Sequence, residues 1–294
     1  MIEDIIKYQR TNQSGYKYSI LIPTWNNIEF LKVCINSIRR NSFYNAQIIV
    51  IINEGNDGTV EWIEGQNEID YLYSKNNLGI CYSLNIARSI IKSEYLVYVN
   101  DDMYVLPNWD LELFTEIEHI GHKSFMLSGT MIEPADTPNP CVIVRDYGKN
   151  IPDFKEELLL KDYKRLFVND WNGSTLPPLI LHIDMWDLVG GMSIEFSPGL
   201  YSDPDLSMKL FKAGVRLFKG KGNSLVYHFG SKSTKRVKQT GGRKTFILKW
   251  GFTSKLFTEK FLQKGKSFSG EAIIPELNKI TLLINKVKRI ISCW

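Results

Sequence analysis

Two adjacent carboxylates, Asp101 and Asp102, follow Asn100 at the end of an apolar run of the sequence, Tyr95–Val99. Such a run predicts a buried strand, and a strand that ends in acidic residues brings carboxylates to the sheet edge where α/β proteins bind ligands. Carboxylate oxygens suit hard divalent cations, and a cation or solvent offsets the repulsion between two neighbouring carboxylates. We therefore expect either a cation site that holds a diphosphate or a solvated turn rich in Asp.

A second acidic pair, Asp203 and Asp205, surrounds Pro204 and precedes an apolar pattern of helical spacing that ends at Gly214. Asp followed by Pro is typical of a helix start, with Asp203 as the N-cap and Pro204 at the first helical position. A carboxylate near a helix N-terminus should stay ionised, which is the state that a general base requires. Capping alone also explains Asp203, so both interpretations stay open.

His228 follows a run typical of a strand, Ser224–Tyr227. Imidazole nitrogen is a common metal ligand. A lone histidine after a strand is nevertheless more often a hydrogen-bonded structural residue, so spacing alone does not assign His228 to a metal site.

The elements that would position these groups alternate between strand and helix. Apolar runs predict strands at 18–22, 46–52, 71–73 and 95–99, and apolar residues at helical spacing predict helices between them. Polar turns follow the first three strands, at Pro23–Asn27, Asn53–Gly58 and Asn76–Gly79. This alternation predicts an α/β fold with a mostly parallel sheet flanked by helices, whose loops gather at one edge. Ligands should bind at that edge.

The order of these loops resembles the family 2 glycosyltransferases, which have the A-type nucleotide-sugar (GT-A, Rossmann-like) fold. The matching segments in the first half are Ile22–Asn26, Asn53–Thr59, Asn76–Gly79 and Val99–Asp102, the last at the family's DxD motif. In the second half they are Gly190–Met192, Phe196–Leu206, Lys212–Gly214 and Val226–His228. The resemblance covers roughly residues 18 to 232 and implies an inverting, metal-dependent transferase that uses a nucleoside-diphosphate sugar, with UDP the commonest nucleotide of the family.

The resemblance also implies which residues bind the donor and the cation. The donor set is Pro23, Thr24, Asn26, Asn53, Glu54, Asn76, Gly79, Asn100 and Asp101. Asp102 and His228 are the expected ligands of Mn²⁺ or Mg²⁺. This sequence departs from the family where Asn53–Asn56 replaces the common Asp-Asp-Gly-Ser and where Asn100 replaces the first Asp of the DxD motif. An amide can still bond to base or ribose, so these changes leave the nucleotide uncertain but do not exclude binding.

On the acceptor side, the resemblance gives Asp203 the role of general base, with Asp205 as the fallback. Trp186, Gly190 and Gly191 are expected under the acceptor, because aromatic faces stack on sugar rings; core packing is the alternative for the tryptophan. The segment 133–178 has no clean periodicity and is expected to select the acceptor, a glycan or glycoconjugate. The polar, basic segment 231–236 is expected to order over the diphosphate.

Charge divides the 294-residue chain into an acidic body and a basic tail. Residues 231–294 carry 15 Lys and Arg and three Glu, a formal charge of +12, whereas residues 1–230 carry 21 basic and 29 acidic residues, a charge of −8. We expect a catalytic domain at 1–232, with a donor half at 18–105 and an acceptor half at 106–232, and a basic helical extension at 233–294. Apolar residues recur at helical spacing over 277–294, which predicts a basic amphipathic helix. Such a helix could dock on its own domain, on a partner or on an anionic membrane surface.

The composition excludes several classes of protein. The N-terminal residues lack the charge order of a signal peptide and no run is long enough for a membrane span, so we expect a cytoplasmic protein, with membrane contact at most peripheral. The four cysteines lack CxxC spacing, which argues against a zinc knuckle. No nucleic-acid-reading motif accompanies the basic tail. Two alternatives remain, a non-catalytic carbohydrate- or nucleotide-binding module and a sugar-phosphate nucleotidyltransferase, although the latter's glycine-rich basic loop is missing.

Overall fold

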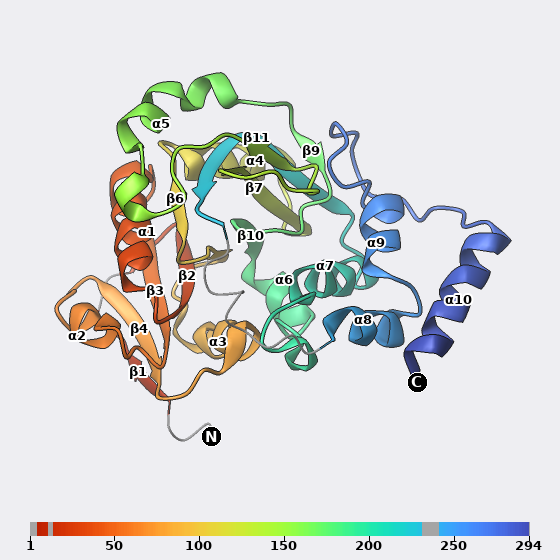
Figure 1. The fold of residues 1–294 in the computed structure, drawn as a ribbon, viewed down its shortest axis with the longest axis horizontal. Helices are drawn as coiled ribbons and strands as arrows, with labels where there is room; N and C mark the ends of the chain where they lie inside the picture. The colour runs from red at the N-terminus through yellow and green to blue at the C-terminus, as the bar shows by residue number, and fades with distance from the viewer. Residues whose placement is uncertain (1–4, 11–13, 231–240, 294) are drawn as a thin grey trace.

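Figure 1 shows a mixed sheet with helices packed on both of its faces. This computed structural model describes residues 5–10, 14–230 and 241–293. The strands are β1 (Ile6–Tyr8), β2 (Tyr18–Trp25), β3 (Ala46–Asn53), β4 (Ile69–Ser74), β5 (Tyr95–Tyr98), β6 (Met103–Val105), β7 (Phe125–Glu133), β8 (Val142–Val144), β9 (Trp171–Asn172), β10 (Leu179–His182) and β11 (Leu217–His228). Their order in the sheet is β1-β4-β3-β2-β5-β10-β7-β11-β6, with β8 paired to β7 and β9 paired to β11.

The long strands of the sheet run in one direction. Strands β4, β3, β2 and β5 pair in parallel, and so do β7, β11 and β8. Strand β10 is antiparallel to both β5 and β7, which gives the two parallel groups the same direction. The short strands β1, β6 and β9 also run against the majority. The predicted α/β fold with a mostly parallel sheet is confirmed, and the carboxyl ends of its long strands meet at one edge.

Strand β2 extends further than the sequence suggests. We expected Pro23 to end it after Ile22, but Pro23, Thr24 and Trp25 continue the parallel pairing with β3. Pro23 is tolerated because β5 pairs only with Ser19–Leu21, so no ladder bond on that side needs the amide that proline lacks. This extension carries Thr24 and Trp25 to the sheet edge.

The helices cover the two faces of the sheet. They are α1 (Ile28–Asn41), α2 (Thr59–Glu64), α3 (Gly79–Ala87), α4 (Trp109–Ile120), α5 (Glu156–Asp162), α6 (Ile183–Leu188), α7 (Ser202–Lys212), α8 (Gly242–Trp250), α9 (Ser254–Leu256) and α10 (Lys279–Cys293), with a turn of π-helix at Phe257–Phe261. Apolar residues of α1, α2 and α4 pack into one core. Those of α3, α6, α7 and α8 pack into a second core on the other face. Within the described residues, no helix combines the length and apolar character that crossing a bilayer requires.

The core continues past the expected domain boundary at residue 232. Phe246 of α8 and Phe257 are fully buried in the same core as α3 and α7. Residues 242–262 are therefore packed into the body of the protein, and the peripheral part of the basic tail is α10, which lies beside α8 (Figure 1).

Candidate active site

A cavity of about 320 Å³ lies at the carboxyl edge of the sheet. It falls where ligands of open α/β sheets bind, and its size suits a small organic ligand. Its lining residues come from the ends of the long strands and from the loops that follow them: Pro23, Thr24, Trp25, Asn53, Asn77, Gly79, Ile80, Tyr98, Asn100, Asp101, Asp102, Met131, Glu133, Asn139, Leu176, Pro177, Pro198, Gly199, Leu200, Tyr201, Ser202, Asp203 and His228. The edge predicted from the strand and helix order therefore holds the cavity.

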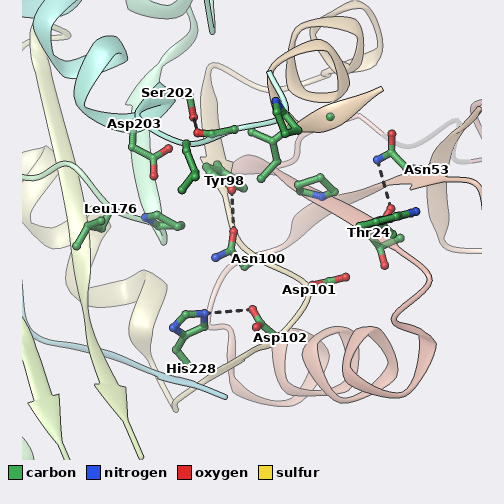
Figure 2. Close-up of a pocket in the computed structure, with 18 of the residues that line it drawn as sticks. Thr24, Asn53, Tyr98, Asn100, Asp101, Asp102, Leu176, Ser202, Asp203 and His228 are labelled. Carbon is green, nitrogen blue, oxygen red and sulfur yellow. Dashed lines mark hydrogen bonds and ion pairs between the residues drawn. The ribbon is translucent and has the colours of Figure 1, made fainter. Parts of the chain in front are cut away.

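Asp102 and His228 lie side by side in this cavity although 126 positions separate their numbers in the sequence. His228 Nε2 is 3.2 Å from Asp102 Oδ1 (Figure 2). The backbone imposes this proximity, because β11 pairs with β6 in the register that sets His228 opposite Met103. The amide of Phe229 also donates to the carbonyl of Asp102, at 3.1 Å. Backbone contacts between β6 and β11 and between Asp102 and Phe229 therefore hold the two predicted side chains next to each other.

Glu133 holds the other nitrogen of the same imidazole, and the sequence did not single it out. His228 Nδ1 is 2.7 Å from Glu133 Oε1. Glu133 ends β7, which runs parallel to β11 with Ile132 opposite Tyr227, so the register delivers it to His228. Burial disfavours a charged imidazole, but Asp102 and Glu133 outweigh that cost and raise the pKa of His228 to about 10.

The side chains of this group fit a divalent cation. One carboxylate oxygen and one imidazole nitrogen, both buried, face each other at a distance that one ion can bridge. Carboxylate oxygen suits Mg²⁺ and Mn²⁺, and imidazole nitrogen suits transition metals. Glu133 on Nδ1 would leave Nε2 to act as the ligand, which is the usual arrangement around a metal-bound histidine. The described residues contain no cluster of three or more His, Cys, Asp or Glu side chains suited to a metal. A cation here would therefore take its remaining ligands from a bound diphosphate and water.

Asp203 lines the opposite part of the cavity from Thr24 and Asn53, as Figure 2 shows. The helix α7 begins at Ser202, and its N-cap is Tyr201 in a left-handed conformation (φ 73°), so the prediction that Asp203 caps this helix was wrong. The helix N-terminus was expected to keep this carboxylate ionised, but burial has the opposite effect. Burial raises the pKa of Asp203 to about 7, and the nearby Lys264 opposes this rise only in part. Desolvation therefore exceeds the effect of the helix N-terminus.

Asp205 does not reach the cavity. Its carboxylate is completely buried and accepts hydrogen bonds from Trp250 Nε1 at 2.7 Å and Ser193 Oγ at 2.5 Å, with Lys249 Nζ at 3.0 Å. These contacts join α7 to α8. The position of Asp205 does not support its fallback role as a base, because its carboxylate is bonded to Trp250, Ser193 and Lys249.

The donor residues fall into two groups. Pro23, Thr24, Asn53, Gly79, Asn100 and Asp101 line the cavity, whereas Asn26, Glu54 and Asn76 do not. Glu54 instead accepts from Trp25 Nε1 at 2.8 Å and from Asn26 Nδ2 at 3.0 Å. Glu54 therefore holds the end of β2 in place, and one of its two partners, Trp25, lines the cavity.

Asn53 and Thr24, both expected to bind the nucleotide-sugar donor, differ in whether their side chains already have hydrogen-bond partners. Asn53 Oδ1 accepts from Leu78 N at 3.0 Å and from Ser83 Oγ at 3.2 Å, while its amide donates to the carbonyl of Thr24. Asn53 thus ties three segments of the wall together. Thr24 Oγ1, in contrast, is buried in the wall without a hydrogen-bond partner. A buried polar atom without a partner is costly, so Thr24 is suited to meet a polar atom of a ligand.

Gly79 lies where two loops of the cavity meet. Its φ is 73°, the amide of Ile80 donates to the carbonyl of Pro198 at 3.0 Å, and a Cβ on Gly79 would lie 2.8 Å from Pro198 Cα. Only glycine fits this position without movement of the backbone.

We expect Gly79→Ala to lower the free energy of unfolding by about 3 kcal/mol, from left-handed backbone strain plus displacement of Pro198. Gly121→Ala is the matched control, because Gly121 has φ 69° but nothing within 4 Å of its Cβ position. The control should lose only about 1 kcal/mol. Urea unfolding of both variants measures this difference, and equal losses would contradict the close approach.

The expected acceptor residues lie outside the cavity. Trp186 is buried in the core formed with α3 and α7. Gly191 has φ 63°, and its Cβ position is 2.8 Å from Trp186 Cε2, so the absence of a side chain at Gly191 leaves room for the indole. Gly190 does not line the cavity either. For Trp186 the packing alternative therefore describes its position, because its indole is used in the core.

Comparison with known proteins places the chain among sugar transferases. The model of the family described as glycosyl transferase family 2 matches residues 19–172. The chain belongs to glycosyl transferase family 2. Among curated relatives, a Haemophilus influenzae protein described as an uncharacterized glycosyltransferase is 26% identical over 54% of this chain and 50% of its own length. Chondroitin synthase of Pasteurella multocida is 25% identical over 67% of this chain but 19% of its own length. The match spans half or less of each of these relatives.

Solved structures show the same fold. S. aureus TarS superposes with a TM-score of 0.59 at 14% identity, over 94% of this chain and 44% of TarS. GalNAc-T7, solved with UDP, GalNAc and Mn²⁺, superposes with a TM-score of 0.57 at 12% identity, over 83% of this chain and 50% of the other. These likenesses confirm the GT-A fold expected from the sequence.

Proposed function

We propose that this family 2 glycosyltransferase is an inverting, metal-dependent enzyme that moves a sugar from a nucleoside diphosphate, most simply UDP, to a hydroxyl of a glycan or glycoconjugate. The observation that carries the proposal is the convergence of Asp102, His228 and Asp203 on one cavity. UDP in a TarS structure and UDP with Mn²⁺ in GalNAc-T7 support the choice of nucleotide and cation. Relatives described as chondroitin synthase and hyaluronan synthase support a glycan acceptor.

The cavity has a nucleoside end and an acceptor end. Thr24 and Asn53 lie at one end and Asp203 with Leu176 at the other, with Asn100 between them (Figure 2). We assign base and ribose to the first end, where Thr24 Oγ1 lacks a partner. Tyr98 donates to Asn100 Oδ1 at 2.7 Å, which leaves the Asn100 amide to donate to the ligand.

Asp102 and His228 would hold Mn²⁺ or Mg²⁺ against the diphosphate. The cation supplies Lewis-acid stabilisation of the departing nucleoside diphosphate. The protein contributes the position of these two ligands, which strand pairing fixes before any donor binds. Pro177, Met131 and Pro198 add apolar surface to the cavity wall, which strengthens electrostatic interactions inside it by excluding water.

Asp203 is the proposed base for the acceptor hydroxyl. It lies at the end of the cavity away from Thr24 and Asn53, so an acceptor beside it would meet the sugar from the side opposite the nucleotide. That arrangement favours inversion at the anomeric carbon. A pKa of about 7 is close to the optimum for a base that works near neutral pH.

The role in selecting the acceptor that we propose for segment 133–178 is supported by residues of this segment in the cavity wall. Asn139 and Leu176 come from this segment and line the cavity. The basic segment 231–236, expected over the diphosphate, lies outside the described residues.

A panel of nucleoside diphosphates, each with and without Mn²⁺, tests this proposal by thermal shift. We expect UDP with Mn²⁺ to raise Tm by several degrees, since ligand at about 100 times Kd adds about 2.7 kcal/mol, and UDP with EDTA to raise it far less. Turnover of UDP-sugars is then measured in the same buffer. Stabilisation without turnover would indicate a non-catalytic binding module, and absence of any shift would contradict the proposal.

Glu133 should affect the affinity for Mn²⁺ because it orients the imidazole of His228. Glu133→Gln keeps an acceptor for Nδ1 but removes the charge, and we expect apparent Mn²⁺ affinity to fall about tenfold; Glu133→Ala should lose about a hundredfold because the imidazole is no longer oriented. Titration of Mn²⁺ against UDP-dependent stabilisation measures both. Unchanged affinity in Glu133→Ala would remove Glu133 from the site.

A further inference from the structure

Helix α10 exposes its apolar face to solvent. Ile280, Leu283, Ile284, Val287, Ile290 and Ile291 recur at spacings of three and four residues, and we refer to them as the α10 stripe. Every one of them is exposed, with Ile280 at 70%, Leu283 at 61% and Ile291 at 67%. An amphipathic helix of a globular protein normally turns such a stripe toward the core, so α10 has the opposite orientation.

The polar side of α10 attaches the helix to the protein. Asn285 is 7% exposed, its Oδ1 accepts from the amide of Thr253 at 3.1 Å, and its Nδ2 donates to the carbonyl of Thr281 at 2.8 Å. Asn285 lies across the helix from the stripe at about 100° per residue. Figure 1 shows α10 at the periphery, beside α8 and α9. Because a polar contact sets this orientation, the stripe faces away from the body.

The charges of α10 identify what the stripe fits. Lys279 and Lys286 fall on one edge of the stripe and Lys288 on the other, at about 100° per residue, and residues 279–293 contain no Asp or Glu. We propose that the α10 stripe binds the surface of an anionic lipid bilayer, with its apolar side chains among the acyl chains and the lysines at the phosphates. Each such cation strengthens binding about fivefold. This inference does not depend on the proposed transferase chemistry.

A second copy of the chain is a poorer occupant. Two α10 helices that paired through their stripes would bring lysines against lysines, with no acidic residue in either helix to compensate. An anionic surface satisfies both the apolar stripe and its basic edges.

The test is co-sedimentation of the full chain with vesicles of phosphatidylcholine, with or without phosphatidylglycerol. We expect binding to the anionic vesicles and little to the neutral ones. Leu283→Gln with Val287→Gln should weaken binding at least about tenfold. Leu282→Gln is the matched control, because Leu282 is 52% exposed on the same helix but lies off the stripe, and it should stay within about twofold of wild type. Circular dichroism confirms that each variant is folded.

Three results would overturn the proposal. The first is failure of the wild-type chain to bind anionic vesicles. The second is an equal loss of binding in Leu282→Gln and in the stripe variant, because the stripe would then have no special role. The third is a wild-type chain that forms an oligomer and does not bind vesicles, together with a stripe variant that is monomeric. That result would identify a second copy of the chain as the occupant of the stripe.

Discussion

Replacing Asp203 with Asn lowers kcat/KM for sugar transfer by about 10³-fold, because the amide keeps the shape of the side chain but cannot take the proton of the acceptor hydroxyl. In the wild type, burial raises the pKa of Asp203 to about 7. The base is active only when ionised, so kcat/KM should rise as pH increases through about 7 and level off above it. A pH profile of wild type and variant measures both effects, and Asp203→Asn should lose this limb.

The same substitution should stabilise the protein at alkaline pH. The pKa of Asp203 is raised from 3.8 to about 7 in the folded state, so its contribution to stability is present at low pH and is lost as pH rises through about 7. Asp203→Asn removes that penalty. We expect its gain in unfolding free energy over wild type to be on the order of 2 kcal/mol larger near pH 8 than near pH 5.

Asp205→Asn is the control for Asp203. Asp205 is bonded to Trp250, Ser193 and Lys249 rather than to the cavity. Its variant should unfold at a lower temperature than wild type but keep kcat/KM within about tenfold when folded. If Asp205→Asn loses turnover and Asp203→Asn retains it, the base has been assigned to the wrong carboxylate.

The parallel first half of the sheet could be predicted because β2, β3, β4 and β5 each carry a local signal. The apolar runs at β2, β3 and β5 are read directly from the sequence, and the carboxyl ends of parallel strands must share an edge. Asp102 and His228 each follow an apolar run, but only the family resemblance named them as cation ligands. Their contact depends on the register between β6 and β11, and short-range patterns do not contain that register.

The sequence left alternatives open where one residue type serves two purposes. Trp186 could equally be a sugar platform or a core residue, and only tertiary packing decides that it is buried. Asp203 has the pattern of an N-cap, but the N-cap lies two residues earlier, at Tyr201, whose positive φ no propensity predicts. Glu133 had no signal at all, because it reaches His228 only through the pairing of β7 with β11.

For the C-terminal helix, too, the sequence pattern did not determine which side of the helix faces solvent. Its periodicity predicted α10 correctly, and the sequence left open whether its apolar face would cover the protein's own core. The buried polar contact of Asn285 with Thr253 sets this side of the helix against the protein, so the stripe faces outward. A hydrophobic pattern identifies an amphipathic helix, but a polar anchor on the opposite face decides which side is available.

Replacing Asp102 with Asn should reduce kcat/KM about 10³-fold, because the amide lacks the charge that a divalent cation requires beside a diphosphate. His228→Gln should lose about as much, since Asp102 and His228 are the two proposed protein ligands and lie 3.2 Å apart. In both variants, Mn²⁺ should no longer increase the thermal stabilisation by UDP. In the wild type, EDTA should abolish turnover and added Mn²⁺ should restore it.

Asp101→Asn is the matched control for this second prediction. Asp101 neighbours Asp102 and lines the same cavity, whereas the carboxylate of Asp102 is the one that lies 3.2 Å from the imidazole of His228. Its variant should stay within about tenfold of wild type and keep the Mn²⁺ effect on UDP stabilisation. Equal losses of kcat/KM in Asp101→Asn and Asp102→Asn would mean that the two carboxylates act through their combined negative charge rather than through a cation bound to Asp102. Full turnover in EDTA would rule out a cation altogether, and Asp102 and His228 would then be an ion pair that shapes the cavity.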